Sequence, residues 1–188
     1  MTLTSAQMGF TKLQALDDQI IVDLRYATPN NFTKQVVYDF TTGIARTGTA
    51  EKLAHASHLL QTQGYRIKVW DAYRPVSAQE KLFEVYPDPT FVLPPNPNMS
   101  HQKGVTFDVT LTDLAGQEVE MPTAFDDFSQ QAKRASFETW TPVAQKNYLI
   151  LDKAMQKAGF VGYENEWWDY RDSQMDDYQP LAADSNKF

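Results

Sequence analysis

The chain has 188 residues, of which 42% are hydrophobic, and it carries a formal net charge of −7. This length suits one packed core and is short for two, so we expect a single domain spanning residues 1–188. The acidic charge argues against nucleic acid and anionic membranes as partners, because both bind basic surfaces, and the absence of cysteine excludes disulfide scaffolds, thiolate metal sites and cysteine nucleophiles.

The first half of the chain alternates between strand patterns and helix patterns. The expected elements are a strand at 20–27, a turn at 28–32, a helix at 49–63, a strand at 65–75 and a helix at 77–86. The first of these helices carries Leu53, Ala56 and Leu60 on one apolar stripe, and Gly64 supplies its C-terminal stop.

The second half of the chain opens with five prolines between residues 87 and 97, which predict an irregular loop over the surface. The elements expected after it are a hairpin with strands at 104–112 and 117–122, a helix at 141–158, and a strand or strand-and-turn at 160–170. Thr141 is the expected N-cap of that helix, Pro142 its first residue and Gly159 its stop. Strands and helices are mixed without a regular βαβ alternation. The expected fold class is therefore α+β, with a mainly antiparallel sheet and helices on one face.

Histidine is scarce, with three in the chain. His55 and His58 share a predicted helix without a third ligand nearby, so we expect a structural role for both. His101 and Asp108 instead flank the start of an apolar strand, where a buried aspartate needs a partner for its charge. Such a pair supplies two of the three protein ligands of a catalytic metal site, although the spacing alone favours a loop histidine and a solvent-facing aspartate.

Arg74 ends an apolar strand in VWDAYRP and precedes a proline. A guanidinium fixed at a strand end can hold a carboxylate or stabilise an oxyanion. Taken alone, the residue is explained equally well by a salt bridge to Asp71 or to another nearby acid.

The segment ENEWWDYRD, residues 164–172, places two adjacent tryptophans among acidic residues. In a regular strand Glu166 and Asp169 point to opposite faces, so they share one site only if a bulge or turn lies between them. In that case one carboxylate can bind a metal, while the other, partly desolvated beside an indole, gains the raised pKa of a general base. Taken alone, the segment is better explained as a core plug formed by Trp167 and Trp168, with two exposed acids.

Five blocks of sequence follow one another along most of the chain. They are YATPNNF (26–32), WDAYRP (70–75), SHQKGVTFD (100–108), FDDF (125–128) and EWWDY (166–170). Together they resemble the D-alanyl-D-alanine dipeptidases, the VanX-type zinc peptidases. Chance agreement of all five is implausible, so the combination is far more specific than any one motif.

The resemblance implies a compact α+β domain of the D,D-peptidase/Hedgehog-like fold that binds one Zn²⁺ ion. His101 and Asp108 match the first two metal ligands, and Asp169 stands at the position of the third. Glu166 matches the general base that takes a proton from the metal-activated water. Arg74 matches the residue that stabilises the oxyanion as this water attacks the amide carbonyl.

The resemblance also implies the substrate, a small dipeptide. Tyr26 and Asp126 match positions that hold its free ammonium end, which suits a dipeptide rather than a longer peptide. The expected function is hydrolysis of D-alanyl-D-alanine, which either removes the vancomycin target precursor or recycles the dipeptide from wall turnover. The alternatives are a D,D-carboxypeptidase acting on longer muropeptides and a catalytically silent protein that binds D-Ala-D-Ala or a wall fragment.

Two residues depart from the family pattern. The family usually has Glu-Trp-Trp-His where this chain has Asp169 in the last place, and it commonly has a serine where this chain has Met99. A His/Asp/Asp set is more anionic than His/Asp/His. We therefore expect it to retain a divalent cation and to shift its preference towards Mn²⁺, Fe²⁺ or Co²⁺.

The N-terminal segment MTLTSAQMGFTKLQ lacks a charged region followed by an apolar one, and no apolar run approaches the length of a membrane span. A cytoplasmic location and the absence of a membrane partner are therefore expected. The sequence gives no indication of the oligomeric state.

Overall fold

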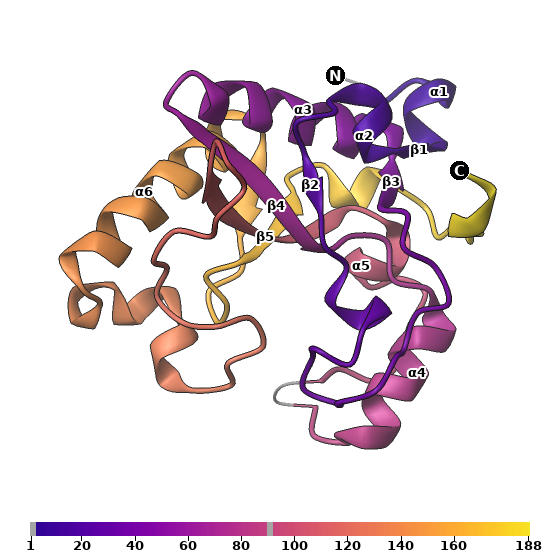
Figure 1. Ribbon diagram of the computed structural model, residues 1–188. Coiled ribbons are helices and arrows are strands. Elements are labelled where there is room, and N and C mark those ends of the chain that lie inside the picture. The colour runs from indigo at the N-terminus through magenta and orange to yellow at the C-terminus, as the bar shows by residue number, and fades with distance from the viewer. Residues whose placement is uncertain (1–2, 90–91) are drawn as a thin grey trace.

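The computed structural model describes residues 3–89 and 92–188, which are organised around a five-stranded sheet with the strand order β2-β4-β5-β7-β6 (Figure 1). β2 (Ile21–Val22) pairs in parallel with β4 (Tyr65–Asp71). β5 (Thr106–Asp113), β7 (Asp169–Asp172) and β6 (Phe160–Gly162) follow in antiparallel pairs. The predicted α+β class with a mainly antiparallel sheet is confirmed.

Two long helices cover one face of the sheet. α3 (Thr47–Gln61) and α6 (Pro142–Lys157) pack against each other, α3 lies on β4, and α6 lies on β5 and β6 (Figure 1). Alternate residues of β4 and β5 enter the apolar core with these helices, and all are fully buried: Ile67, Val69, Phe107, Val109 and Leu111. Each such burial stabilises the fold by about 1.5–3 kcal/mol, which fixes the orientation of the sheet. The intervening residues consequently face the other side.

Both long helices begin and end within two residues of their predicted bounds. Thr141 caps α6, because its hydroxyl accepts a hydrogen bond of 3.1 Å from the amide of Ala144, and Pro142 follows it. Gly64 and Gly159 lie just beyond the two helices with φ values of +83° and +98°, a region of backbone conformation that glycine adopts at little cost.

A shift of register between β4 and β5 decides which acidic residues share a face. The pairing skips one residue after Val69, so that Trp70 is an extra residue in β4. This bulge pairs Asp71 with Asp108, so that the side chain of Asp71 faces away from the helices. In a regular strand Asp71 would lie on the same face as Val69, towards the helices. Asp108 in turn pairs with Asp169 of β7. Three buried aspartates therefore form one row across three adjacent strands.

A second apolar cluster lies between α4 (Val76–Val85) and the segment 24–40, at the lower right of Figure 1. Its buried members are Leu24, Tyr26, Val37, Tyr38, Phe40, Ala78, Leu82 and Val92. The site described below is lined both by this cluster and by the aspartate-bearing face of the sheet.

The strand predicted at 20–27 is wrong beyond its first residues. After β2 the chain leaves the sheet, and Arg25–Ala27 form a 3₁₀ turn. The reason lies in the backbone of Tyr26, whose carbonyl accepts hydrogen bonds from the amides of Val37 and Tyr38 instead of a neighbouring strand. This turn brings the ring of Tyr26 into the second cluster.

Two other predicted strands are also too long. The strand predicted at 65–75 ends at Asp71, because the amides of Tyr73 and Arg74 donate to the carbonyls of Ile44 and His101, outside the sheet. The return strand predicted at 117–122 is reduced to a single bridge, between Thr112 and Glu118, although the turn at 113–116 is present.

The remaining described elements are short. They are α1 (Ser5–Met8), β1 (Phe10–Lys12), α2 (Leu13–Leu16), β3 (Ile44–Arg46), α5 (Ser100–Lys103) and 3₁₀ turns at Gln130–Ala132, Arg134–Thr139, Met175–Asp177 and Ser185–Lys187. β1 and β3 pair in a small separate sheet. Residues 87–89 and 92–97 are irregular as predicted, whereas Thr90 and Phe91 lie outside the described residues. None of the helices in the described ranges has the length and apolar character needed to cross a membrane.

Candidate active site

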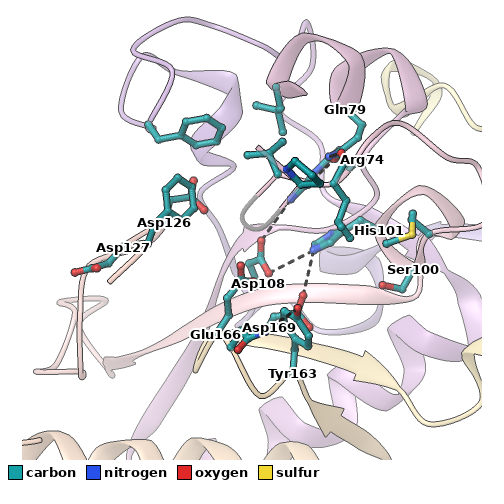
Figure 2. Close-up of a pocket in the computed structure, with 18 of the residues that line it drawn as sticks. Arg74, Gln79, Ser100, His101, Asp108, Asp126, Asp127, Tyr163, Glu166 and Asp169 are labelled. Carbon is teal, nitrogen blue, oxygen red and sulfur yellow. Dashed lines mark hydrogen bonds and ion pairs between the residues drawn. The ribbon is translucent and has the colours of Figure 1, made fainter. Parts of the chain in front are cut away.

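A cavity of about 210 Å³ lies between the sheet and the second cluster, and Figure 2 shows its lining. All seven residues that sequence analysis selected for the site line this one cavity: Tyr26, Arg74, His101, Asp108, Asp126, Glu166 and Asp169. Ligand pockets for drug-sized molecules are typically about 300–1,000 Å³, so a cavity of this size suits a smaller ligand.

His101 is oriented by the backbone around it. Gly104 ends α5 with a φ of +72°, which lets the chain turn directly into β5. The Nδ1 atom of His101 lies 3.0 Å from the carbonyl oxygen of Ala72 and therefore carries a proton that it donates there. Nε2 lies 3.4 Å from Oδ1 of Asp108 and 3.7 Å from Oδ2 of Asp169 (Figure 2). Nε2 is thus the nitrogen available to a metal ion.

The carboxylates around His101 favour its protonated form. Burial and the Arg74 guanidinium oppose that charge, but Asp108 and Asp169 outweigh them and raise the pKa of His101 to about 10. Burial also raises the pKa of Asp108, against the opposing effect of His101. A divalent cation satisfies the same carboxylates and can replace the histidine proton.

Three carboxylates converge beside His101. Asp108, Glu166 and Asp169 each offer an oxygen, and these oxygens lie within 4.8 Å of one another. Asp108 is only 3% exposed, and its Oδ1 accepts no hydrogen bond from the described residues. A buried acceptor without a hydrogen bond costs about 1–3 kcal/mol, and a charged one costs more. This oxygen therefore calls for a cation.

Glu166 reaches the cavity because a turn precedes β7. Residues 163–168 connect β6 to β7, and the amide of Tyr163 donates to the carbonyl of Asp169 at 3.0 Å across the base of this connection. Trp167 and Trp168 both lie in this turn and are buried. The turn brings Glu166 and Asp169 to the same cavity, which a regular strand could not do (Figure 2).

The surroundings of Glu166 change its acidity. Burial, followed by the charges of Asp169 and Asp108, raises the pKa of Glu166 well above its ordinary value. A carboxylate that binds a proton more readily near neutral pH is better suited to act as a general base.

Arg74 projects into the cavity from the segment that follows β4. Its Nε and Nη2 donate to Oδ2 of Asp71 at 2.8 Å and 2.6 Å, and its Nη1 donates to Gln79 at 2.8 Å. The salt bridge between Arg74 and Asp71, which was the alternative explanation of Arg74, is therefore present. A guanidinium has more N–H groups than these bonds use, so donors remain for a ligand oxygen.

Asp126 lies at another side of the cavity (Figure 2), and Tyr26, which also lines the cavity, is its hydrogen-bond partner. The Tyr26 hydroxyl donates to Oδ2 of Asp126 at 2.8 Å. Asp126 has a φ of +56°, in the left-handed region that few residues other than glycine adopt. Burial, followed by the charge of Asp108, raises the pKa of Asp126 to about 7. An ammonium group placed beside Asp126 would stabilise its carboxylate form.

The balance of charge fits a divalent cation. Four carboxylates lie around His101, namely those of Asp71, Asp108, Glu166 and Asp169. Arg74 and Arg171 pair with three of them, and in the ranges 3–89 and 92–188 no ion pair reaches Glu166. Buried carboxylates in excess of cations are costly, and a 2+ ion at Nε2 of His101, in place of the histidine proton, would offset that excess. One imidazole nitrogen with carboxylate oxygens suits Zn²⁺ and other first-row ions.

The cavity lies in a part of the chain that matches a known family. Residues 6–184 match the family model described as D-ala-D-ala dipeptidase. The chain belongs to the D-Ala-D-Ala dipeptidase family. It is therefore a member of a peptidase family, as the resemblance of the five blocks indicated.

Relatives in the D-Ala-D-Ala dipeptidase family come from several bacteria. The D-alanyl-D-alanine dipeptidase of Escherichia coli (strain K12) is 32% identical over 163 residues, which cover 87% of this chain and 83% of the relative. The protein of the same name from Enterococcus faecium is 31% identical over an alignment of 185 residues, and the match covers 87% of this chain and 91% of the relative. A third, from Enterococcus faecalis, is 30% identical with the same coverage.

In this member of the D-Ala-D-Ala dipeptidase family, two residues at the site escaped sequence analysis. Asp71 was considered only as an alternative partner of Arg74, yet it also accepts a hydrogen bond of 2.6 Å from Tyr38. No sequence pattern indicates the bulge that turns Asp71 to the face of the sheet that carries Asp108. Arg171 places Nε 3.3 Å from Oδ1 of Asp169, and the strand alternation in DYRD could have indicated that they share a face.

The two histidines assigned a structural role lie elsewhere. His55 and His58 are exposed on α3, and Nε2 of His58 lies 3.6 Å from Oδ2 of Asp17. Neither residue lines the cavity.

Proposed function

We propose that this protein hydrolyses the peptide bond of D-alanyl-D-alanine in a metal-dependent reaction. The observation that carries the proposal is the meeting of two groups in one small cavity. His101, Asp108, Glu166 and Asp169 support hydrolysis with a bound cation. Asp126, held by Tyr26, supports a short substrate with a free ammonium group.

His101 Nε2, Asp108 and Asp169 would hold the ion. Zn²⁺ is the ion expected, and the carboxylate of Asp169 makes Mn²⁺, Fe²⁺ and Co²⁺ stronger competitors than an imidazole would. When bound, such an ion supplies Lewis acidity to a carbonyl oxygen and lowers the pKa of water. Arg171, paired with Oδ1 of Asp169, leaves Oδ2 directed towards His101.

Glu166 is the proposed general base. It accepts a proton from the attacking water and returns it to the amine that leaves, a task suited to its raised pKa. Arg74 uses the N–H groups not bound to Asp71 and Gln79 to stabilise the negative charge that develops on the carbonyl oxygen. Asp71 keeps that guanidinium oriented.

Asp126 sets the length of the substrate. In a dipeptide the free ammonium group and the scissile carbonyl belong to the same residue, so the two lie close together, and Asp126 and Glu166 line the same small cavity. A longer peptide would present an uncharged amide to Asp126 and leave its buried carboxylate without a cation, which is costly. This argument favours a dipeptidase over a carboxypeptidase that trims longer muropeptides. We place the reaction in the cytoplasm, where it would remove the vancomycin target precursor or recycle dipeptide from wall turnover.

The test is a metal titration combined with an assay of alanine release. Dialysed protein is titrated with Zn²⁺, Mn²⁺ and Co²⁺ by calorimetry, and each form is given D-Ala-D-Ala or its N-acetylated derivative. We expect one ion per chain, alanine release from the free dipeptide, and much slower release from the acetylated one. Absence of both ion binding and alanine release would support the silent binding protein instead. Equal rates on the two substrates would contradict the role of Asp126.

A further inference from the structure

We infer that Arg134 is a positioning residue that holds the turn carrying Glu166 and Asp169 at the correct place beside His101. The inference rests on the proposed function and names a part of the protein on which that function depends. Arg134 is not among the residues that line the cavity, so it acts through the turn and not on the substrate.

Arg134 bonds to several of the turn's backbone carbonyls at once. Its Nε donates to the carbonyl of Tyr163 at 2.8 Å, and its Nη2 donates to those of Trp167 at 3.0 Å and Asp169 at 3.1 Å. Its own backbone amide donates to the carbonyl of Glu164 at 3.0 Å. The bonded carbonyls belong to residues that precede and follow Glu166 in the chain. The guanidinium therefore fixes the backbone on both sides of the proposed general base.

The other side of the guanidinium is anchored to the rigid part of the fold. Nη1 of Arg134 donates to the hydroxyl of Tyr148 at 2.7 Å and to Oδ1 of Asp152 at 2.8 Å, both on α6. Its Cζ also lies 4.4 Å from the ring centroid of Tyr170 on β7. The Arg134 side chain is 15% exposed and that of Asp152 is 12% exposed, so water screens their ion pair little. The turn is thereby tied to the long helix that packs on the sheet.

Gly162 leaves the space that the guanidinium occupies. A Cβ atom added at this position would lie 2.1 Å from Cζ of Arg134 and 2.4 Å from both of its Nη atoms. Replacement of Gly162 by alanine must therefore displace the guanidinium. This gives a second way to disturb the contact without removing the arginine.

The contact acts on one half of the proposed machinery. Glu166 and Asp169 belong to the turn and to the residue that follows it, whereas His101 and Asp108 come from α5 and β5. Loss of the contact should move the base and the third ligand relative to the other two. Lysine cannot replace arginine here, since an ammonium on a flexible stem cannot direct a planar fork at several fixed carbonyls.

The experiment compares Arg134→Lys and Gly162→Ala with Arg46→Lys. Arg46 is a matched control, because it is 2% exposed, donates to the carbonyl of Gln179 at 2.9 Å and lies over a tyrosine ring, yet does not line the cavity. Metal affinity, kcat and KM are measured well below each variant's melting temperature. Amide hydrogen exchange is recorded over residues 163–169.

We expect Arg134→Lys and Gly162→Ala to weaken ion binding by about 10–100-fold, as is usual when a residue that supports a metal ligand is lost. We expect kcat to fall about 10-fold or more and KM to stay within about 3-fold, since Tyr26 and Asp126 lie on other segments. Exchange over 163–169 should accelerate. Arg46→Lys should lose thermal stability and keep the wild-type values of all these quantities. In an Asp169→Ala background, Arg134→Lys should weaken ion binding by less than about 3-fold further, since the ligand it positions is gone.

If Arg134→Lys does not fold, Tyr148→Phe removes one anchoring hydroxyl and should give the same pattern at smaller size. The inference is overturned if the folded variants lose stability as Arg46→Lys does but keep wild-type affinity, kcat and exchange. Absence of ion binding and alanine release in the wild-type protein would overturn the proposed function instead. In that case faster exchange over 163–169 in Arg134→Lys still supports a positioned turn, and unchanged exchange rejects it.

Discussion

Two sides of the cavity are built by different means. On the strand-built side Asp108 and Asp169 line the cavity, and Asp71 extends their row across β4, β5 and β7 beside His101. The loop-built side consists of Tyr26, on a 3₁₀ turn, and Asp126, on a segment with a left-handed backbone. The first is fixed by the hydrogen-bond ladder of the sheet, whereas the second depends on loops. Loops tolerate changes that a central strand does not, so substrate preference can change on one side while the chemistry on the other is retained.

The two sides also differ in their need for positive charge. On the strand-built side Arg74 and Arg171 pair with the three aspartates, and either the proton of His101 or the proposed ion supplies the remaining positive charge. The loop-built side has one carboxyl group with a pKa of about 7, which an ammonium group can convert to its charged form. The proposed ion and the ammonium group of the substrate would therefore supply positive charge at different places. Substitutions on the two sides should separate ion binding from substrate binding.

The largest effect is expected for Glu166→Gln, which removes the proposed base next to the strand-built side. We expect kcat to fall by about 10²–10⁴-fold, the usual contribution of a general base, with little change in metal affinity or KM. Alanine release and calorimetric titration of the same preparation measure both. A loss of ion binding would instead identify Glu166 as a ligand, which its distance to Asp108 and Asp169 permits.

Asp169→Ala should follow in size. We expect it to weaken Zn²⁺ binding by about 100-fold or more, because one anionic ligand is lost, while Asp169→His should preserve or raise Zn²⁺ affinity relative to Mn²⁺. Competition titrations with the two ions measure the change in preference. Unchanged binding in the alanine variant would show that Asp169 is not a ligand.

Asp126→Asn should affect the loop-built side alone. We expect KM for D-Ala-D-Ala to rise about 10–100-fold with kcat within a few-fold of wild type, since a charge-assisted contact to the ammonium is lost. In the wild type, kcat/KM should rise with pH as the Asp126 carboxyl loses its proton near pH 7, or lower when a nearby cation stabilises the carboxylate. The variant should lose the contribution of Asp126 to this limb and keep that of the Glu166 base. A fall in kcat at constant KM would contradict the separation of the two sides.

The smallest effect is expected for Tyr26→Phe, which removes the hydroxyl that donates to Asp126 at 2.8 Å. That hydrogen bond lowers the pKa of Asp126, so its loss should move the midpoint of the pH profile upwards. We expect KM at neutral pH to rise about 3–10-fold, in line with the net contribution of one typical hydrogen bond. A downward shift of the midpoint would show that the hydroxyl does not stabilise the carboxylate.

The elements that could be predicted from sequence are those that local physics determines. α6 follows from its cap at Thr141 and its stop at Gly159, and β5 follows from alternating β-branched residues. The strand predicted at 20–27 fails because the hydrogen bonds that end it come from residues 37 and 38. The sequence pattern of residues 20–27 alone cannot indicate these hydrogen bonds.

The site was predictable to the extent that its residues belong to recognisable blocks. Spacing alone left the pairing of Glu166 with Asp169 open, because the answer depends on a turn that two tryptophans form within an otherwise strand-like segment. Asp71 remained outside the predicted site, since its orientation depends on the bulge at Trp70. Both omissions concern the face to which a residue points, and a single extra residue or turn reverses that face.

The row of three aspartates across β4, β5 and β7 has a consequence for how the protein matures. Like charges directly opposite one another destabilise a sheet, so a newly made chain must close its central strands against their repulsion. A ligand that binds only the folded chain adds stability in proportion to the logarithm of its concentration. The supply of the proposed ion should therefore set how long the protein survives proteolysis as well as how fast it turns over the proposed substrate.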